Sequence, residues 1–173
     1  MQSYKVVITG PFNAGKTVFI QTASDIDIVT TERKITDPSL SGIKKETTVA
    51  MDYGQKRMDN AVFHLHGTPG QERFEFMWKI LAREMNAFIL LIDSADKGSL
   101  MDAKQITRLF LKQSKVPYLV VANKQDLRGA MAPRKIAQLL TLPKDVPVVP
   151  CVAQDPASVD QVFVIARQLL DKS

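Results

Sequence analysis

The chain has 173 residues, of which 45% are hydrophobic and 24% are charged, and it carries a formal net charge of +5. This length and balance predict a single globular domain over residues 1–173 with its own buried core, and they exclude an intrinsically disordered chain. The Lys and Arg residues are scattered in pairs without interleaved aromatic residues, which favours solvated surfaces over a nucleic-acid site as the explanation of the positive charge.

The first predicted element is a buried strand over residues 4–9, YKVVIT, which leads into the stretch GPFNAGKT at 10–17 and a predicted helix over 16–24. A glycine, four further residues and then Gly-Lys-Thr, placed between a strand and a helix, form the pattern of a phosphate-binding loop. In such a loop the backbone N–H groups converge on one anion, while Lys16 supplies positive charge for the β and γ phosphates and the Thr17 hydroxyl suits Mg²⁺. The predicted nucleotide-binding residues of this stretch are Gly10, Asn13, Ala14, Gly15, Lys16, Thr17 and Val18.

The region after this helix predicts a long connection and then a hairpin. Residues 24–46 are rich in Thr, Ser, Asp and Lys, and long connections in compact domains usually serve function. Residues 47–67 predict a β-hairpin with its turn at Gly54–Gln55. His64 and His66 alternate along the returning strand and could hold a metal ion, but with no third ligand nearby in the sequence a packing or surface role is favoured.

The second half of the chain alternates strands and helices. Continuous hydrophobic runs predict buried strands over 87–93, 117–123 and 146–150. Helices are predicted over 74–85, 97–113, 133–141 and 156–171, where Pro133, Pro156 and Asp155 suit helix starts. The whole pattern predicts an α/β fold with a six-stranded, mostly parallel sheet, one antiparallel edge hairpin strand and helices on both faces.

The stretch ANKQD at 122–126 follows a predicted strand and bears on which base is bound. It lies at the carboxyl edge of the sheet, where open α/β folds bind their ligands. The Asp126 carboxylate only accepts hydrogen bonds, so it can take two N–H donors of guanine, whereas adenine presents an acceptor there. Asn123, Lys124 and Asp126 are therefore predicted to bind a guanine nucleotide. The alternative is an ATPase in which the strand that ends at Asp93 supplies the metal-side carboxylate.

Together these motifs resemble the Ras-like small GTPases, and the resemblance covers essentially the whole chain with its motifs at matching spacing. It implies a P-loop NTPase G domain in which Thr48 belongs to the first switch, with its hydroxyl on Mg²⁺ and its amide on the γ-phosphate. It also implies that GTPGQERF, residues 67–74, forms the second switch. There the N–H of Gly70 would contact the γ-phosphate, and Gln71 would orient the attacking water.

The resemblance implies the remaining contacts and the reaction as well. CVAQ, residues 151–154, would place a backbone N–H of Val152 or Ala153 against the guanine oxygen. The implied metal ligands are Thr17 and Thr48, and the implied catalytic residues are Gln71 and Lys16. The implied function is a molecular switch that binds GTP and GDP with Mg²⁺, hydrolyses GTP slowly, and acts through effector, exchange or activating proteins.

The chain departs from the family pattern at the second switch. The family has an Asp that holds a Mg²⁺-bound water there, whereas this chain has Gly67. Asp52, on the neighbouring strand of the hairpin, is the candidate replacement, and a cross-strand surface charge is its other interpretation. Gly67 also favours an alternative function, a guanine-nucleotide-binding scaffold with little or no hydrolysis. The missing Asp and Pro69 together resemble the prokaryotic branch of the family, the MglA-like polarity GTPases and the small GTPases paired with roadblock-type proteins.

Two aromatic features bear on partners. Phe12 stands where Ras has a glycine beside the γ-phosphate, and its ring would crowd an inserted arginine. We therefore expect an activator that works without such an arginine. The cluster in the second-switch helix either packs inward or forms a partner surface, and it comprises Phe74, Phe76, Met77 and Trp78.

The sequence also bears on where the protein works. No apolar run approaches the roughly 18 residues of a membrane span, and the N-terminus lacks the apolar core of a signal peptide. The single Cys151 excludes an internal disulfide and is interpreted as a small buried residue. Gln2 and the C-terminal LLDKS match neither common lipidation pattern. We expect a cytoplasmic protein that reaches a membrane only through a partner or a surface patch.

Overall fold

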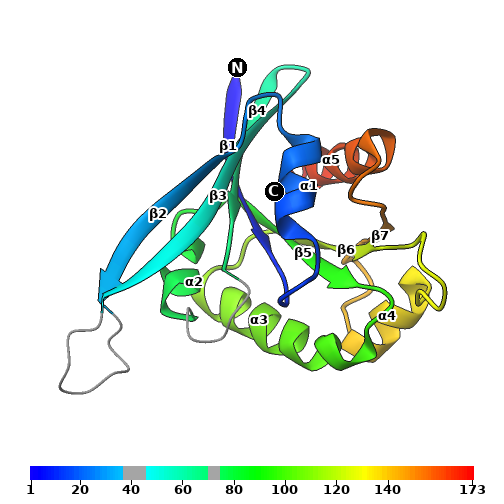
Figure 1. Ribbon diagram of the computed structural model, residues 1–173. Coiled ribbons are helices and arrows are strands. Elements are labelled where there is room, and N and C mark those ends of the chain that lie inside the picture. The colour runs from blue at the N-terminus through cyan, green and yellow to red at the C-terminus, as the bar shows by residue number, and fades with distance from the viewer. Residues whose placement is uncertain (37–45, 70–74) are drawn as a thin grey trace.

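Figure 1 shows the computed structural model, which describes the backbone of residues 1–36, 46–69 and 75–173 and the side chains of residues 1–30, 51–69 and 76–173. The strands form one seven-stranded sheet in the order β2-β3-β4-β1-β5-β6-β7. They are β1 (Gln2–Thr9), β2 (Val29–Thr36), β3 (Glu46–Met58), β4 (Ala61–Gly67), β5 (Ala87–Asp93), β6 (Tyr118–Asn123) and β7 (Val148–Pro150). The helices are α1 (Lys16–Ala23), α2 (Glu75–Ala82), α3 (Leu100–Gln113), α4 (Pro133–Leu140) and α5 (Pro156–Leu170), with a short 3₁₀ turn η2 (Lys97–Ser99).

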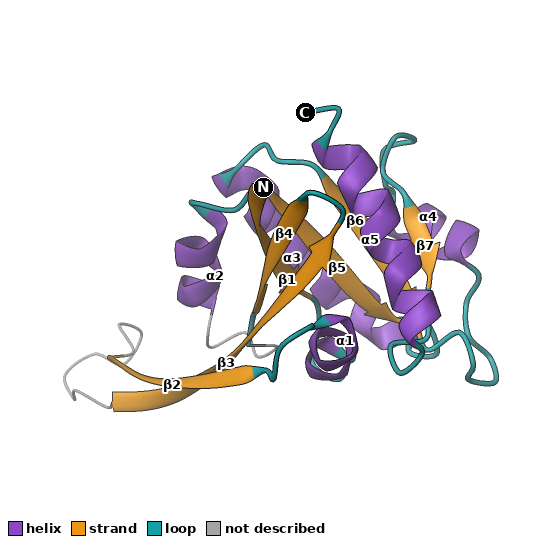
Figure 2. Cartoon of the chain, turned by 90° about the horizontal axis from the view of Figure 1, so that it is seen from above, coloured by secondary structure: helices purple, strands orange, loops and turns teal. Residues whose placement is uncertain are grey.

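Helices cover the sheet on both faces (Figure 2). Each face has its own apolar core. α1 and α5 cover one face, where Phe19 and Phe163 stack with their ring centroids 5.8 Å apart. α2, α3 and α4 cover the other face, where Phe88 packs against both Phe110 and Tyr118. β1, β5 and β6 run parallel between these layers. The carboxyl ends of the three strands therefore meet at one edge of the sheet, which the two cores hold in place.

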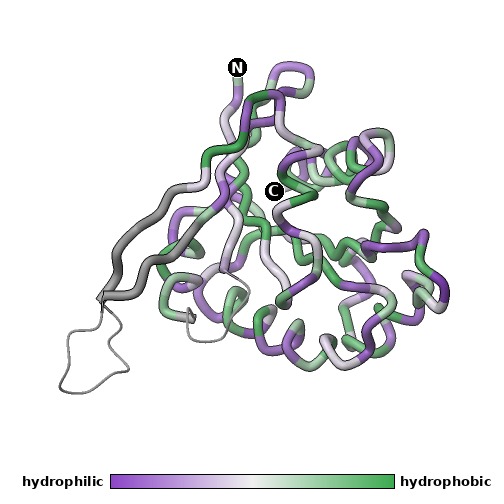
Figure 3. Tube along the Cα trace, in the orientation of Figure 1, coloured by the Kyte–Doolittle hydropathy of each residue, from purple (hydrophilic) through white to green (hydrophobic). Residues whose placement is uncertain are grey.

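The helices follow the expected helical periodicity. Figure 3 shows hydrophobic and hydrophilic residues alternating along α3, whose buried side chains are Leu100, Ala103, Ile106 and Phe110. Pro133 and Pro156 begin α4 and α5, and the Asp155 carboxylate caps α5 by accepting a hydrogen bond from the backbone N–H of Ala157, as predicted. In the described ranges no helix combines the length and the apolar character needed to cross a membrane.

The sheet has seven strands and not the predicted six, because β2 lies inside the predicted connection of residues 24–46. β2 has the sequence VTTERKIT and pairs antiparallel with β3, from Val29 opposite Tyr53 to Thr36 opposite Glu46. An edge strand does not have to be buried on both faces, so it carries no continuous hydrophobic run. The α/β fold with helices on both faces is confirmed, whereas the sequence pattern missed this polar edge strand.

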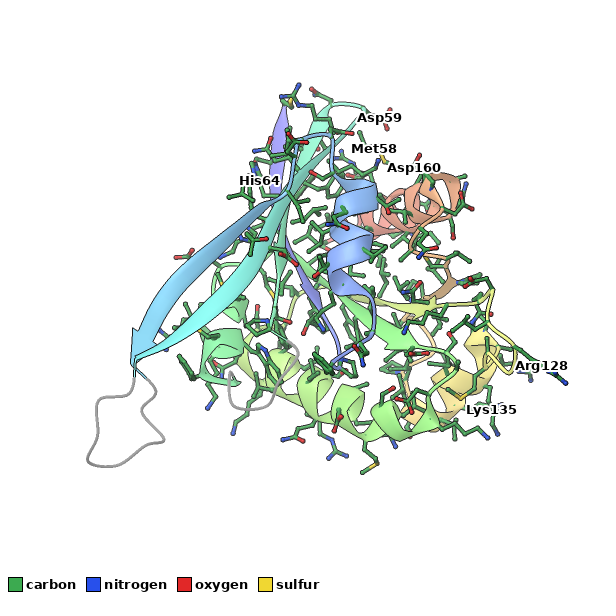
Figure 4. All side chains as sticks on the ribbon, viewed as in Figure 1. Met58, Asp59, His64, Arg128, Lys135 and Asp160 are labelled. Atoms are coloured by element: carbon green, nitrogen blue, oxygen red, sulfur yellow. The ribbon has the colours of Figure 1, made fainter. Side chains whose placement is uncertain are left out.

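The turn predicted at Gly54 and Gln55 is also wrong. β3 runs past both residues, and the turn lies at Asp59 and Asn60, at the tip of the β3–β4 hairpin (Figure 4). Asp59 has a φ of 50°, a conformation that Asp and Asn adopt more readily than most residues. Gly54 has a different purpose, because a Cβ there would lie 2.8 Å from the Oγ of Ser24 at the end of α1. The glycine thus lets α1 pack closely on β3.

The aromatic cluster of α2 packs mainly inward. Met77 and Trp78 are buried, and the Trp78 Nε1 donates a hydrogen bond to the backbone oxygen of Pro69 at 2.8 Å. Phe76 is half-buried, and Phe74 lies outside the described residues. Met77 and Trp78 therefore belong to the packing of α2 and not to a partner surface.

Candidate nucleotide-binding site

The loop between β1 and α1 has a shape that only its glycines allow. Gly10 has a φ of 147°, and a Cβ there would overlap the backbone oxygen of Leu91. Gly15 has a φ of 97°, and a Cβ there would lie 2.5 Å from the Asn123 Nδ2. Both positions exclude a side chain by conformation and by space. The first N–H groups of α1 follow directly and have no acceptor within the helix, so the loop and the helix start together suit an anion.

The Lys16 side chain closes over this loop. Its Nζ donates hydrogen bonds to the backbone oxygens of Gly10 at 2.7 Å and Pro11 at 2.9 Å. Burial lowers the pKa of Lys16 to about 8, and the nearby Asp52 carboxylate acts in the opposite direction. Two carbonyl oxygens therefore hold the ammonium group where phosphate oxygens are predicted to bind. Bound phosphates would replace these carbonyl oxygens as its hydrogen-bond acceptors.

We expect nucleotide binding to take up protons above pH 8. In the free protein Lys16 loses its proton as the pH rises through its pKa of about 8, and a bound polyphosphate favours the charged form. The affinity should therefore fall as the pH rises above 8, by up to about tenfold per pH unit. Calorimetric titration above pH 8 in two buffers of different ionisation enthalpy measures the uptake. Lys16→Arg, which stays charged, is the control, and equal uptake in both proteins would contradict the expectation.

Two adjoining cavities form one cleft at the carboxyl ends of β1, β5 and β6. The larger cavity, of about 450 Å³, is lined by the phosphate loop together with Asp52 and Gly67. The smaller cavity, of about 170 Å³, is lined by the loops that follow β6 and β7. Both cavities are lined by Gly15, Val18 and Lys124, so they adjoin at these residues. This arrangement brings the predicted phosphate-binding and base-binding residues to opposite ends of one cleft.

Asn123 joins the two ends of the cleft. Its Nδ2 donates to the backbone oxygen of Ala14 in the phosphate loop, and its Oδ1 accepts from the backbone N–H of Ala153, both at 2.9 Å. The residue is only 2% exposed, so both hydrogen bonds are shielded from water. One amide side chain thus sets the distance between the phosphate loop and the base loop. The sequence assigned Asn123 to the nucleotide, and the structure shows it positioning the protein around the cleft.

Lys124 makes a second link across the phosphate loop. It has a φ of 62°, and its Nζ donates to the backbone oxygen of Asn13 at 2.8 Å. The same Nζ pairs with the Asp93 Oδ2 at 2.6 Å. The Asp93 carboxylate is therefore engaged by Lys124, whereas the Thr17 hydroxyl is bonded to Asp52. The ATPase alternative required Asp93 beside the metal and loses its support here.

The base end of the cleft combines a carboxylate with an apolar surface. Asp126 is exposed at the wall of the smaller cavity, as its predicted role requires. Leu127 lies beside it and is 46% exposed, although the sequence analysis did not single it out. An exposed leucine next to a loop carboxylate is the signal that could have identified it, because a purine ring needs an apolar face as well as a polar edge.

The loop after β7 is tied down by its own hydrogen bonds. The N–H of Val152 donates to the Oγ of Ser158 at 2.9 Å, and the N–H of Ala153 is used by Asn123. A guanine oxygen would have to share or replace one of these bonds, so the predicted contact with either N–H stays a prediction. Cys151 is buried, and burial raises the pKa of its thiol, which agrees with a packing role.

Thr17 and Asp52 meet at the phosphate end of the cleft. The Thr17 Oγ1 donates a hydrogen bond to the Asp52 Oδ2 at 2.6 Å, and the Asp52 Oδ1 accepts one from the Thr30 Oγ1 at 3.1 Å. Hydroxyl and carboxylate oxygens are the hard donors that Mg²⁺ prefers, so this pair fits a nucleotide-bound magnesium ion. Asp52 lines the larger cavity and is not an isolated surface charge.

Thr48, the predicted metal ligand of the first switch, lies away from this pair. The backbone of Thr48 lies in β3 opposite Lys34 of β2. Four residues of extended strand separate it from Asp52, which corresponds to about 13 Å, and Figure 1 shows the β2–β3 hairpin projecting away from α1. The structure therefore does not bring Thr48 to Thr17. Gly70 and Gln71 lie outside the described residues.

His64 and His66 are held by packing on the β3–β4 hairpin, with His64 on the side away from α1 (Figure 4). The Tyr53 hydroxyl hydrogen bonds with the His64 Nδ1 at 2.7 Å, and its ring centroid lies 5.1 Å from that of His66. Burial, aided by the charge of Lys5, lowers the pKa of His66 to about 4, so this ring is neutral near pH 7. Within the described part of the chain, no group of three or more His, Cys, Asp or Glu residues could hold a metal ion.

Comparisons with known proteins bear on the family of this chain. The model of the ADP-ribosylation factor family matches residues 1–173. An uncharacterized protein of Methanocaldococcus jannaschii is 35% identical over 123 residues, which are 71% of each chain. ADP-ribosylation factor-like protein 4A of Homo sapiens is 31% identical over 145 residues, which are 82% of this chain and 68% of its own.

One solved structure extends the agreement to the fold. The Arl6 BBS3 small GTPase from Trypanosoma brucei, solved with the bound nucleotide analogue GppNp, superposes with a TM-score of 0.75 at 22% identity and covers 99% of both chains. At that identity the likeness concerns the fold alone. The family match, in contrast, spans the whole chain. This chain therefore belongs to the ADP-ribosylation factor family of small GTPases.

Proposed function

We propose that this protein is a molecular switch that binds GTP and GDP with Mg²⁺ and slowly hydrolyses GTP. The observation that carries the proposal is the pair of adjoining cavities, between which Asn123 ties the phosphate loop to the base loop by two hydrogen bonds of 2.9 Å. Lys16 supplies positive charge at one end, and Asp126 accepts the N–H donors of guanine at the other. Extraction of the nucleotide from the purified protein tests the proposal. Guanine nucleotides are expected, and adenine nucleotides would overturn the assignment.

The residues of the chain would act by positioning and by charge stabilisation. Lys16 and the N–H groups of the phosphate loop hold the β and γ phosphates, and Gln71 orients the attacking water. Thr17 and Thr48 would hold a nucleotide-bound Mg²⁺, which would supply positive charge against the charge that develops on the phosphates. No arginine is among the described residues that line the larger cavity. Intrinsic turnover is therefore expected to be slow, on the order of 10⁻⁴ to 10⁻² s⁻¹.

The γ-phosphate supplies the switching step. Thr48 and Gly70 are proposed to contact it in the GTP-bound protein and to lose it after hydrolysis. Because Thr48 lies in β3 away from Thr17, this contact requires the β2–β3 hairpin to slide or open. An effector that prefers one arrangement would then read the nucleotide state. Phe12 is 65% exposed at the cavity wall, which supports the proposal of an activator without an inserted arginine.

Replacing Gln71 by Ala is expected to slow single-turnover phosphate release on the order of 10²-fold, because the attacking water loses its orienting group. Bound GTP and GDP should be retained, since the proposed contacts with the base and the phosphates are assigned to other residues. Phosphate release from GTP-loaded protein measures the effect, with Gln105→Ala, at an exposed position of α3, as a matched control. Release from neither the natural chain nor the variant, with GTP still bound, would support the scaffold instead.

The narrower resemblance to MglA-like GTPases stays a proposal beside the family match. The relatives reported above come from an archaeon and from Homo sapiens, and they do not address that branch. A roadblock-type protein, exchange factors and activating proteins are accordingly proposed partners, and a cytoplasmic location is the proposed setting. Co-purification with a roadblock-type protein in a nucleotide-dependent manner would support the narrower assignment.

A further inference from the structure

We propose that Asp52 supplies the carboxylate that Gly67 lacks, so that the nucleotide-bound Mg²⁺ is held between α1 and β3 and not between α1 and the end of β4. The inference rests on the proposed function, and it concerns the arrangement in which Thr48 lies away from Thr17, so the metal ion it describes is the one that would accompany GDP. The resemblance to small GTPases places this carboxylate at the end of β4, whereas the inference places it on β3.

The Asp52 side chain already contacts the hydroxyl that is assigned to the metal. Its Oδ2 accepts from the Thr17 Oγ1 at 2.6 Å. Its Oδ1 accepts from the Thr30 Oγ1 at 3.1 Å, and Thr30 lies opposite Asp52 in the neighbouring strand. Thr30 is therefore a positioning residue for this carboxylate. Each carboxylate oxygen retains a lone pair, so the group can receive a cation or a cation-bound water.

Gly67 and Asp52 share the same space. A Cβ on Gly67 would lie 3.4 Å from the Asp52 Cβ and 3.6 Å from its backbone oxygen. It would also lie 2.8 Å from the Cδ1 of Ile20, which is the end of a flexible side chain. The contacts with Asp52 are ordinary van der Waals distances, so an acidic side chain can enter this region from either position, and two carboxylates there would repel each other. The glycine leaves the space to Asp52.

The charges around the larger cavity point to the same residue. Among the described residues that line it, Asp52 alone is negatively charged, and the basic ones are Lys16 and Lys124. Asp93, the nearby alternative, is paired with Lys124 at 2.6 Å. The Asp52 carboxylate is also close enough to Lys16 to raise its pKa against the effect of burial. Asp52 is thus the acidic side chain, among the described residues that line the larger cavity, that is available to a divalent cation bound to a polyphosphate.

The test follows the release of a fluorescent GDP derivative as Mg²⁺ is titrated. Mg²⁺ is expected to slow release from the natural chain, and Asp52→Ala should raise the Mg²⁺ concentration for half of this effect by about tenfold or more. In excess EDTA the two proteins should release GDP at similar rates, because the metal no longer contributes. Asp27→Ala is the matched control, since it removes an exposed carboxylate outside the cavity.

A second variant supplies the carboxylate from the end of β4 in place of β3. Gly67→Asp combined with Asp52→Ala is expected to restore much of the Mg²⁺ dependence, because the two side chains enter the same space. Gly67→Asp alone should weaken it through like-charge repulsion. Thermal unfolding checks that each variant is folded. Asp52→Asn, which keeps the size of the side chain, takes the place of Asp52→Ala if the alanine variant unfolds.

The outcomes separate this inference from the proposed function. An unchanged Mg²⁺ dependence in Asp52→Ala or Asp52→Asn overturns the inference, and so does a folded double variant without recovery. Either result leaves a guanine-nucleotide switch in place. A natural chain that binds no GDP, with or without Mg²⁺, would overturn the proposed function itself.

Discussion

Asp126→Asn is expected to change the preferred ligand from guanine to xanthine nucleotides. The Asp126 carboxylate can accept the two N–H donors on the pyrimidine edge of guanine, whereas an amide offers one acceptor and one donor. Xanthine carries an oxygen where guanine has its amino group, so it matches the amide. The variant keeps one acceptor for guanine and loses the other hydrogen bond to a charged group, which contributes about 1.5–3 kcal/mol, so the dissociation constant for GDP should rise by about 10–10²-fold or more.

Competition binding of GDP, XDP and ADP measures this change of base preference. Asp155→Asn is the matched control, because the Asp155 carboxylate caps α5 by accepting from the N–H of Ala157 at 3.1 Å. Asn caps a helix about as well as Asp, so this variant should keep both its stability and its preference for GDP. An Asp126→Asn protein with the base preference of the natural chain would show that another group selects the base.

Asn123→Ala is expected to destabilise the protein and to loosen the cleft. The variant leaves the backbone oxygen of Ala14 and the N–H of Ala153 without the partner that each has at 2.9 Å. Both residues are buried, so each lost partner should reduce the free energy of unfolding by about 1–2 kcal/mol. For a domain of this length the midpoint of thermal unfolding should fall by about 4–16 °C. GDP affinity should fall as well, because the two loops are no longer held at a set distance.

Thermal unfolding and GDP titration of the same preparations distinguish these effects. Gln125→Ala is the matched control, since its amide donates to the Ser94 Oγ at 2.8 Å and to the backbone oxygen of Met131 at 2.9 Å but does not contact the phosphate loop. We expect Gln125→Ala to lose stability with much less change in GDP affinity. Equal losses of affinity in both variants would show that Asn123 has no special role between the loops.

The parts of the fold that depend on neighbouring residues were predictable. β5 coincides with the hydrophobic run at 87–93, and Asp155 with Pro156 marks the start of α5. A buried strand or a helix start is specified by residues that are adjacent in the sequence, so local patterns suffice. The same holds for the glycines of the phosphate loop, whose positive φ values at Gly10 and Gly15 follow from the motif.

The edge of the sheet was less predictable, because its structure depends on residues that are distant in the sequence. β2 is polar, and it becomes a strand only because β3 pairs with it. Gly54 suggests a turn when it is considered alone, yet the approach of Ser24 and α1 explains it. Neither fact has a local signature, since each depends on an element that packs from elsewhere in the chain.

The sequence by itself determined which chemistry the cleft can hold. The contiguous loop from Gly10 to Thr17 suits phosphate, and the carboxylate of Asp126 suits guanine, because these groups act through short segments whose geometry follows from residue type. Only the tertiary structure decided that Thr17 meets Asp52, 35 positions away, while Thr48 lies apart from both. Those relations depend on the register of β3 against its neighbouring strands, and a shift by one residue would turn Asp52 to the opposite face of the sheet.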